Sequence, residues 1–125
     1  MKSTESETMI RIEQAIRERK REERRRCWDY LQSMSEVVLT DTHRSEWLNM
    51  TELARLAKKH KILWGTIRLD RHQLQMQLRE FFDTYRSACI GNVEVEPREG
   101  EGRRSKLRVQ FRRTFNIEPV AGIQI

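Results

Sequence analysis

The sequence predicts an α+β fold, chiefly because the spacing of its apolar residues changes along the chain. Before about residue 88 these residues recur every three or four positions, which is typical of amphipathic helices. After Gly91 they alternate with polar residues, which is typical of strands that bury one face. The segment 17–26 contains no apolar residue and is typical of a solvated helix. We therefore expect a long helix, two shorter helices and then a two-stranded β-hairpin.

Length and composition allow a single domain. The chain has 125 residues, of which 37% are hydrophobic, enough for a small core. We expect a helical arm at 1–39 that is part of the domain or packed on it, the domain at 40–113, and an apolar tail at 114–125. No apolar run approaches the roughly 18 residues that span a membrane, and the first ten residues lack the apolar core of a signal peptide. The expected location is cytoplasmic, or nuclear in a eukaryote.

The arm is expected to be helical over residues 8–39. Met9, Ile12 and Ile16 form one apolar stripe, and a second stripe starts at Cys27. The charged segment 17–26 lies between them, and we interpret it as a solvated helix between two docking ends. Nucleic-acid contact and a flexible arm remain alternatives.

Two shorter helices are expected after a loop at 40–46 and the apolar pair at 47–48. The first opens at Thr51, a suitable N-cap, and a connector follows at 62–69. The second runs from Asp70 to about Ala88, and Gln73 stands where Asp70 needs a capping-box partner. Its buried stripe comprises Leu74, Leu78, Phe81, Phe82 and Tyr85.

The hairpin is expected at about 92–97 and 106–112, with the segment between them as a long loop. Its buried face should carry Val93, Val95, Leu107, Val109 and Phe111. The expected register pairs Val95 with Val109 and Val93 with Phe111. On the outer face it pairs Glu96 with Arg108 and Glu94 with Gln110.

Positive charge is concentrated on this hairpin. The net charge of the chain is +6, and residues 103–113 contain six cations and no acidic residue. Such a local excess indicates a polyanionic partner, of which nucleic acid is the commonest.

Three segments together resemble the winged helix-turn-helix superfamily. WLNMTELARLA resembles the short first strand leading into the second helix of that family. DRHQLQMQLREFF resembles its recognition helix, and GNVEVEPREGEGRRSKLRVQF resembles its hairpin wing. The likeness covers residues 47–113. The nine-residue connector at 61–69 and the long basic helix before the motif depart from the family pattern.

The resemblance implies that the wing follows the DNA backbone while the helix from Asp70 enters the major groove. Backbone contacts are then expected from the cations of the wing and its strand, which are Arg98, Arg103, Arg104, Lys106, Arg108, Arg112 and Arg113. Cations at the end of the short helix are added to this set: Lys58, Lys59 and Lys61. Candidates for reading bases are Arg71, His72, Gln73 and Gln77.

The sequence offers little support for catalysis, a cofactor or a metal. It contains no phosphate-binding loop, dinucleotide fingerprint, zinc-protease motif or nucleophile elbow. Cys27 and Cys89 are far apart, without ligand spacing, and are expected to be buried or surface thiols. No small-molecule ligand or membrane contact is inferred.

The functional expectation is a non-enzymatic protein that binds duplex DNA, as a transcription regulator or accessory factor. A replication or packaging accessory protein with the same architecture is one alternative. A winged module that binds an acidic protein is an alternative of a different class, and RNA binding is less favoured because no stacking aromatics alternate with the basic strand. A homodimer through the N-terminal helix or the apolar C-terminal tail also remains open.

Overall fold

The computed structural model describes residues 2–100 and 106–114, and the side chains from residue 6 onward. The described chain is an α+β structure, as predicted, with three helices and a four-stranded antiparallel sheet. The helices are α1 (Lys2–Val38), α2 (Met50–Lys59) and α3 (Arg71–Thr84). The strands are β1 (Leu48–Asn49), β2 (Ala88–Ile90), β3 (Val93–Glu99) and β4 (Leu107–Arg113). They are ordered β1-β4-β3-β2 in the sheet.

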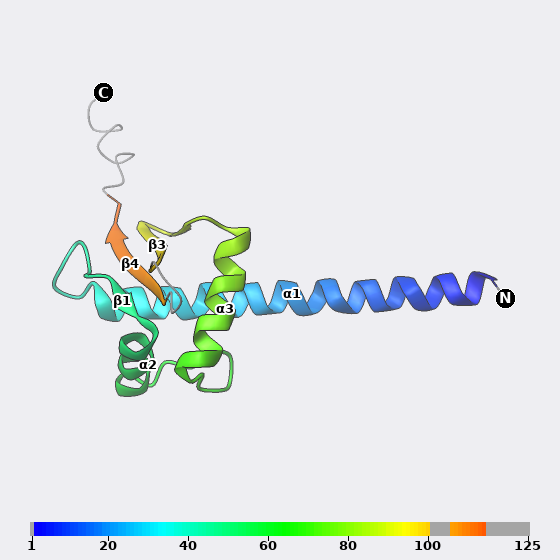
Figure 1. Cartoon of the computed structure of the whole chain (residues 1–125), viewed down its shortest axis with the longest axis horizontal. Helices are drawn as coiled ribbons and strands as arrows, with labels where there is room; N and C mark the ends of the chain where they lie inside the picture. Colours follow the sequence, from blue (N-terminus) through cyan, green and yellow to red (C-terminus); the bar gives the residue numbers. More distant parts are fainter. Residues whose placement is uncertain (1, 101–105, 115–125) are drawn as a thin grey trace, which may run out of the picture.

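Helix α1 is continuous, and only its second half belongs to the folded core. Cys27, Tyr30, Leu31 and Met34 are buried, whereas every side chain from residue 6 to residue 22 is exposed. Figure 1 shows the N-terminal half projecting well beyond the other elements. The charged segment is thus a solvated helix, as we interpreted it. The expectation of two docking ends is wrong for the N-terminal end, which packs on no other described element.

The N-cap of helix α2 lies two residues earlier than predicted. Asn49, not Thr51, is the N-cap, and its side-chain oxygen accepts a hydrogen bond from the backbone N–H of Glu52 at 2.8 Å. Asn49 also pairs with Arg108 in the sheet. One residue therefore ends β1 and caps α2, which fixes the start of the helix against the hairpin.

Helix α3 begins as predicted but ends earlier. The Asp70 carboxylate accepts from the Gln73 backbone N–H at 2.8 Å, and the Gln73 side chain accepts from the Asp70 N–H at 3.2 Å, which confirms the capping box. The helix ends at Thr84 because Tyr85 is already extended. Ala88–Ile90 forms the unpredicted strand β2, joined to β3 by a tight turn in which Gly91 has a φ of 61°.

The hairpin exists, but the predicted register is wrong by two residues. Val95 pairs with Phe111, Glu94 with Arg112 and Glu96 with Gln110. Strand β3 continues past its predicted end at about Pro97 as far as Glu99, so Arg98 and Glu99 lie in a strand where a loop was expected. Because β2 pairs only with the first residues of β3, the later part of β3 has an open edge on that side, where a proline is tolerated.

A slip of two residues preserves the faces of both strands, because side chains alternate with a period of two. The five predicted inward residues are all buried: Val93, Val95, Leu107, Val109 and Phe111. They pack with the core faces of all three helices. Leu74, Leu78, Phe81 and Phe82 are buried as predicted, while Tyr85 is only half-buried. The Trp28 ring meets Phe81 edge-on at a centroid distance of 5.4 Å.

The opposite face of the sheet is largely uncovered. Its outward residues on β3 and β4 include Glu96, Arg98 and Arg108, all exposed. None of the described helices is long and apolar enough to cross a membrane.

Candidate nucleic-acid interface

An open hollow of about 290 Å³ lies where α2 and α3 both begin, beside Lys106, the residue that precedes β4. We call it the α2–α3 hollow. It is lined by Asn49, Met50, Thr51, Arg71, His72, Gln75 and Lys106. It brings the start of α3 together with Lys106, a cation assigned to the wing from the sequence.

The charges around this hollow favour an anion. Arg71, His72 and Lys106 are exposed, and none of the seven described residues lining the hollow is acidic. The N-termini of α2 and α3 add the partial positive charge of their helix dipoles. Asp70 stands beside this surface, but one of its carboxylate oxygens already accepts the Gln73 N–H. A phosphate group is the kind of ligand that such a surface attracts.

Two of the four base-reading candidates lie in this hollow, and two do not. Arg71 and His72 line it, whereas the side-chain oxygen of Gln73 is used in the capping box. Gln77 lines a different depression, so it does not share a surface with Arg71 and His72.

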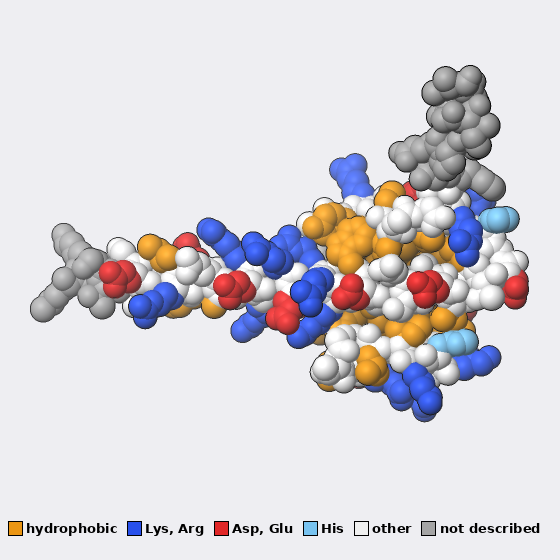
Figure 2. All heavy atoms as spheres, turned by 180° about the vertical axis from the view of Figure 1, so that it is seen from behind, with side chains coloured by type: hydrophobic (Ala, Val, Ile, Leu, Met, Phe, Trp, Pro, Cys, Tyr) orange, Lys and Arg blue, Asp and Glu red, His pale blue; other side chains and the backbone are white. Residues whose placement is uncertain are grey.

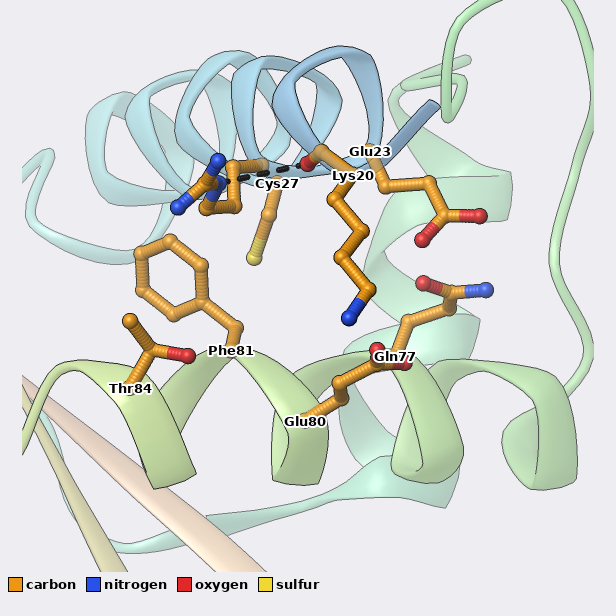
Figure 3. A pocket seen from close by; sticks show the side chains of 8 residues that line it. Lys20, Glu23, Cys27, Gln77, Glu80, Phe81 and Thr84 are labelled. Atoms are coloured by element: carbon orange, nitrogen blue, oxygen red, sulfur yellow. Dashed lines mark hydrogen bonds between the residues drawn. The ribbon is translucent and has the colours of Figure 1, made fainter. Parts of the chain in front are cut away.

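The second depression lies between α1 and α3 and measures about 110 Å³. Figure 3 shows Lys20 and Glu23 of α1 pointing toward Gln77 and Glu80 of α3, with Cys27 and Phe81 alongside. Burial raises the pKa of the Cys27 thiol, so the sulfur stays protonated near neutral pH. Within the described residues, no cluster of three or more His, Cys, Asp or Glu side chains could hold a metal ion.

Arg98 and Arg108 lie together on the uncovered face of the sheet. Arg98 was expected in the wing loop, but it lies in β3, directly opposite Arg108 of β4. The Arg98 guanidinium stacks over the Trp47 ring, with its central carbon 5.7 Å from the ring centroid. An aromatic side chain therefore does accompany the basic strand, although it comes from a distant part of the sequence.

Arg112 and Arg113 are engaged within the fold. Arg112 forms an ion pair with Glu94 at 2.7 Å, and this hydrogen bond raises the pKa of the Arg112 guanidinium. Arg113 donates from its guanidinium to the carbonyl of Leu39, at the end of α1, at 2.9 Å. In the run of cations at 103–113, Arg112 is therefore paired with an acidic side chain and Arg113 is bonded to a backbone carbonyl.

The remaining predicted contacts are dispersed. Lys58, Lys59 and Lys61 are exposed at the C-terminal end of α2, while the hollow lies at its N-terminal end. At 1.5 Å per residue, that separation is roughly 14 Å. Arg103 and Arg104 lie outside the described residues.

Five residues at the hollow and beside the basic strand were not among the sequence candidates: Trp47, Asn49, Met50, Thr51 and Gln75. Gln75 had a usable signal, because it follows Arg71 by four residues and so shares its side of the helix. Trp47 and Asn49 had no such local signal. They reach the basic strand only because β1 pairs with β4.

Searches against protein-family models, curated proteins and solved structures found no match for this chain.

Proposed function

We propose that this chain is a non-enzymatic duplex-DNA-binding protein of winged-helix type, acting as a transcription regulator or accessory factor. The observation that carries the proposal is the α2–α3 hollow, where Arg71 and His72 of α3 meet Lys106 at the foot of the wing. The sequence indicated this helix and this hairpin as separate candidates. The start of the helix and Lys106 line one cationic hollow, which supports the proposal.

The order of the elements supports the winged-helix resemblance. A short strand precedes α2, α3 follows, and β3 and β4 form the hairpin, as the resemblance implies. Strand β2 is an addition at the sheet edge. We propose the winged-helix assignment on this order of elements.

Docking by the N-terminal end of α3 fits the distribution of charge along this helix. Arg71 and His72 lie in its first turn, whereas the exposed acidic residues Glu80 and Asp83 lie two to three turns later. A helix that enters a groove by its first turns keeps such carboxylates away from phosphates. We therefore assign backbone contact to Arg71 and Lys106, and base contact to His72 and Gln75.

The test compares two arginines that flank α3 at opposite ends. Arg71→Ala removes a cation from the hollow, and Arg86→Ala removes another exposed cation beyond the other end of α3. Binding to random duplex DNA is titrated over a series of salt concentrations. We expect Arg71→Ala and Lys106→Ala each to lower the log-salt slope by about 0.9, the value for one lost phosphate contact. Arg86→Ala should leave both the slope and the affinity unchanged.

Parallel titrations with single-stranded DNA and RNA separate the nucleic-acid classes. If the Arg71 and Lys106 variants keep the affinity and slope of the unmodified protein, the hollow is not a DNA site. That result would favour the alternative in which the basic wing faces an acidic protein.

A further inference from the structure

The projecting half of α1 carries an apolar stripe that no described element covers. Met9, Ile12 and Ile16 form this stripe, with exposed fractions of 59%, 50% and 46%. Figure 2 shows charged side chains of both signs mixed around this part of the helix. Burying these three side chains would stabilise any assembly that covers them.

The stripe is a continuation of the face by which α1 packs on the domain. Met9 precedes Cys27, Ile12 precedes Tyr30 and Ile16 precedes Met34, each by 18 positions. Eighteen residues make five full turns of an α-helix, so each pair points in the same direction. Cys27, Tyr30 and Met34 are all buried in the core. The stripe therefore lies on the core-facing side of the helix, beyond the edge of the domain.

The last described strand ends far from the stripe. Arg113, the last residue of β4, donates to the Leu39 carbonyl. Leu39 is about 35 Å along the helix from Ile16 and about 45 Å from Met9, at 1.5 Å per residue. No described strand or helix of the domain therefore reaches the stripe.

We propose that a second copy of this chain covers the stripe, with the two projecting halves of α1 packed antiparallel about a two-fold axis near residues 12 and 13. Met9 of one copy then lies opposite Ile16 of the other, and the two Ile12 side chains meet near the axis. The same patch serves both copies, as an isologous interface requires. The inference is independent of the proposed DNA-binding function.

The position of the domain selects the antiparallel arrangement. In a parallel pair, the second half of the partner helix would run through the space that α2, α3 and the sheet already occupy on this face of α1. In an antiparallel pair, the partner helix ends near the edge of the domain. With the axis near residues 12 and 13, residues 6–19 of the two copies overlap over roughly 20 Å, and residues 2–5 of each copy lie opposite residues 20–23 of the other.

Charge favours the same arrangement. Residues 2–16 carry two cations and three anions, whereas residues 17–26 carry seven cations and three anions. Antiparallel packing places the slightly acidic start of one helix beside the basic segment of the other. Parallel packing would place the two basic segments side by side, where they repel each other.

The first experiment compares two isoleucines of nearly equal exposure on different sides of α1. Ile12 is 50% exposed on the stripe, and Ile10 is 52% exposed well away from it. Sedimentation equilibrium of the full chain measures the dimer dissociation constant. We expect Ile12→Arg to raise it by about 100-fold or more, because each dimer loses two buried isoleucines. Ile10→Arg should change it by less than about threefold, as befits a surface site.

The second experiment tests the direction of packing by disulfide formation, with Cys89→Ser in every protein to remove the exposed native thiol. An equimolar mixture of the Met9→Cys and Ile16→Cys proteins should form a disulfide-linked dimer under mild oxidation. Neither protein alone should do so, because identical positions are then offset by roughly 10 Å, beyond disulfide reach.

A chain that stays monomeric to millimolar concentration would overturn the proposal. So would equal effects of Ile10→Arg and Ile12→Arg, or cross-linking of either cysteine protein alone, which would indicate a parallel pair.

Discussion

The two cysteines show how strongly the position of one residue sets its chemistry. Cys27 is 1% exposed on the core face of α1, while Cys89 is exposed on β2. Burial raises the pKa of the Cys27 thiol. It also raises the pKa of the neighbouring Tyr30, with a smaller contribution from Cys27 itself. Both groups are therefore neutral in the folded protein at neutral pH, and the Cys27 thiol lacks the reactive thiolate form.

We expect iodoacetamide at neutral pH to modify one thiol per folded chain, at Cys89. Mass spectrometry of the intact protein measures the number of added groups, and Cys89→Ser should reduce it to zero. In denaturant both thiols should react. Modification of Cys27 in the folded protein would show that the core face of α1 opens readily.

Leu78 tests the packing of α3 at the level of one side chain. It is fully buried, so Leu78→Ala should lower the free energy of unfolding by roughly 2–5 kcal/mol. Met76→Ala is the control on the same helix, because Met76 is 68% exposed. Its effect should stay within about 0.5 kcal/mol. Urea denaturation followed by circular dichroism gives both values, and similar losses would contradict the assigned face of α3.

At the scale of elements, caps and turns determine where α2 and α3 begin and where the hairpins close. Asn49 caps α2 and Asp70 caps α3, so both helices start at defined points beside the α2–α3 hollow. Gly91 closes the β2–β3 hairpin with a φ of 61°, a conformation that costs a glycine little. The geometry of the candidate interface thus depends on a few residues between elements.

The cap of α3 can be tested by removing one carboxylate. Asp70→Ala should lower the free energy of unfolding by about 1 kcal/mol, because the backbone N–H of Gln73 loses its acceptor. Asp83→Ala removes the same charge near the other end of α3, where it caps nothing and opposes the helix dipole. Because Asp83 also attracts Arg79, the two effects oppose each other, and we expect a change within about 0.5 kcal/mol in the same denaturation experiment. A larger loss for Asp83→Ala would contradict this assignment of the cap.

At the scale of the whole molecule, positive charge is concentrated in more than one region. Two of these regions are the hairpin with the adjacent hollow, and the segment 17–26 of α1, which lies in the projecting half and at the domain edge. A third is the segment 53–69, which has five cations and no acidic residue. Under the proposed function, the region that contacts the polyanion is set by how the whole surface approaches it, and not by any single residue.

Neutralising three cations in the hairpin and three in the segment 17–26 of α1 separates the contributions of these two regions to duplex binding. Replacing Arg103, Arg104 and Lys106 by Ala should lower the log-salt slope of duplex binding by about 2.7, the value for three phosphate contacts. Replacing Arg17, Arg21 and Arg25, which are exposed on α1, changes the net charge equally and should affect the slope little. If the α1 variant instead produces the larger change, the charged helix is the principal nucleic-acid contact.

The sequence by itself determined the helices, the faces they bury and the inward face of the hairpin. These features depend on local periodicity and on caps, as in the Asp70–Gln73 capping box, and local patterns are readable without knowledge of distant partners. Alternation determines which face of a strand is buried, but a register that slips by two residues satisfies it equally well. For this reason the inward residues were predicted correctly and their partners were not.

Only the tertiary structure decided which charged side chains can face a ligand and which are bonded within the fold. Arg112 pairs with Glu94, Arg113 bonds to Leu39, and Gln77 turns toward α1, none of which follows from local sequence. The α2–α3 hollow exists because the starts of two helices and Lys106, which are distant in the chain, meet at one place. Such a meeting depends on how the helices pack against the sheet, and packing is a property of contacts between segments far apart in the sequence.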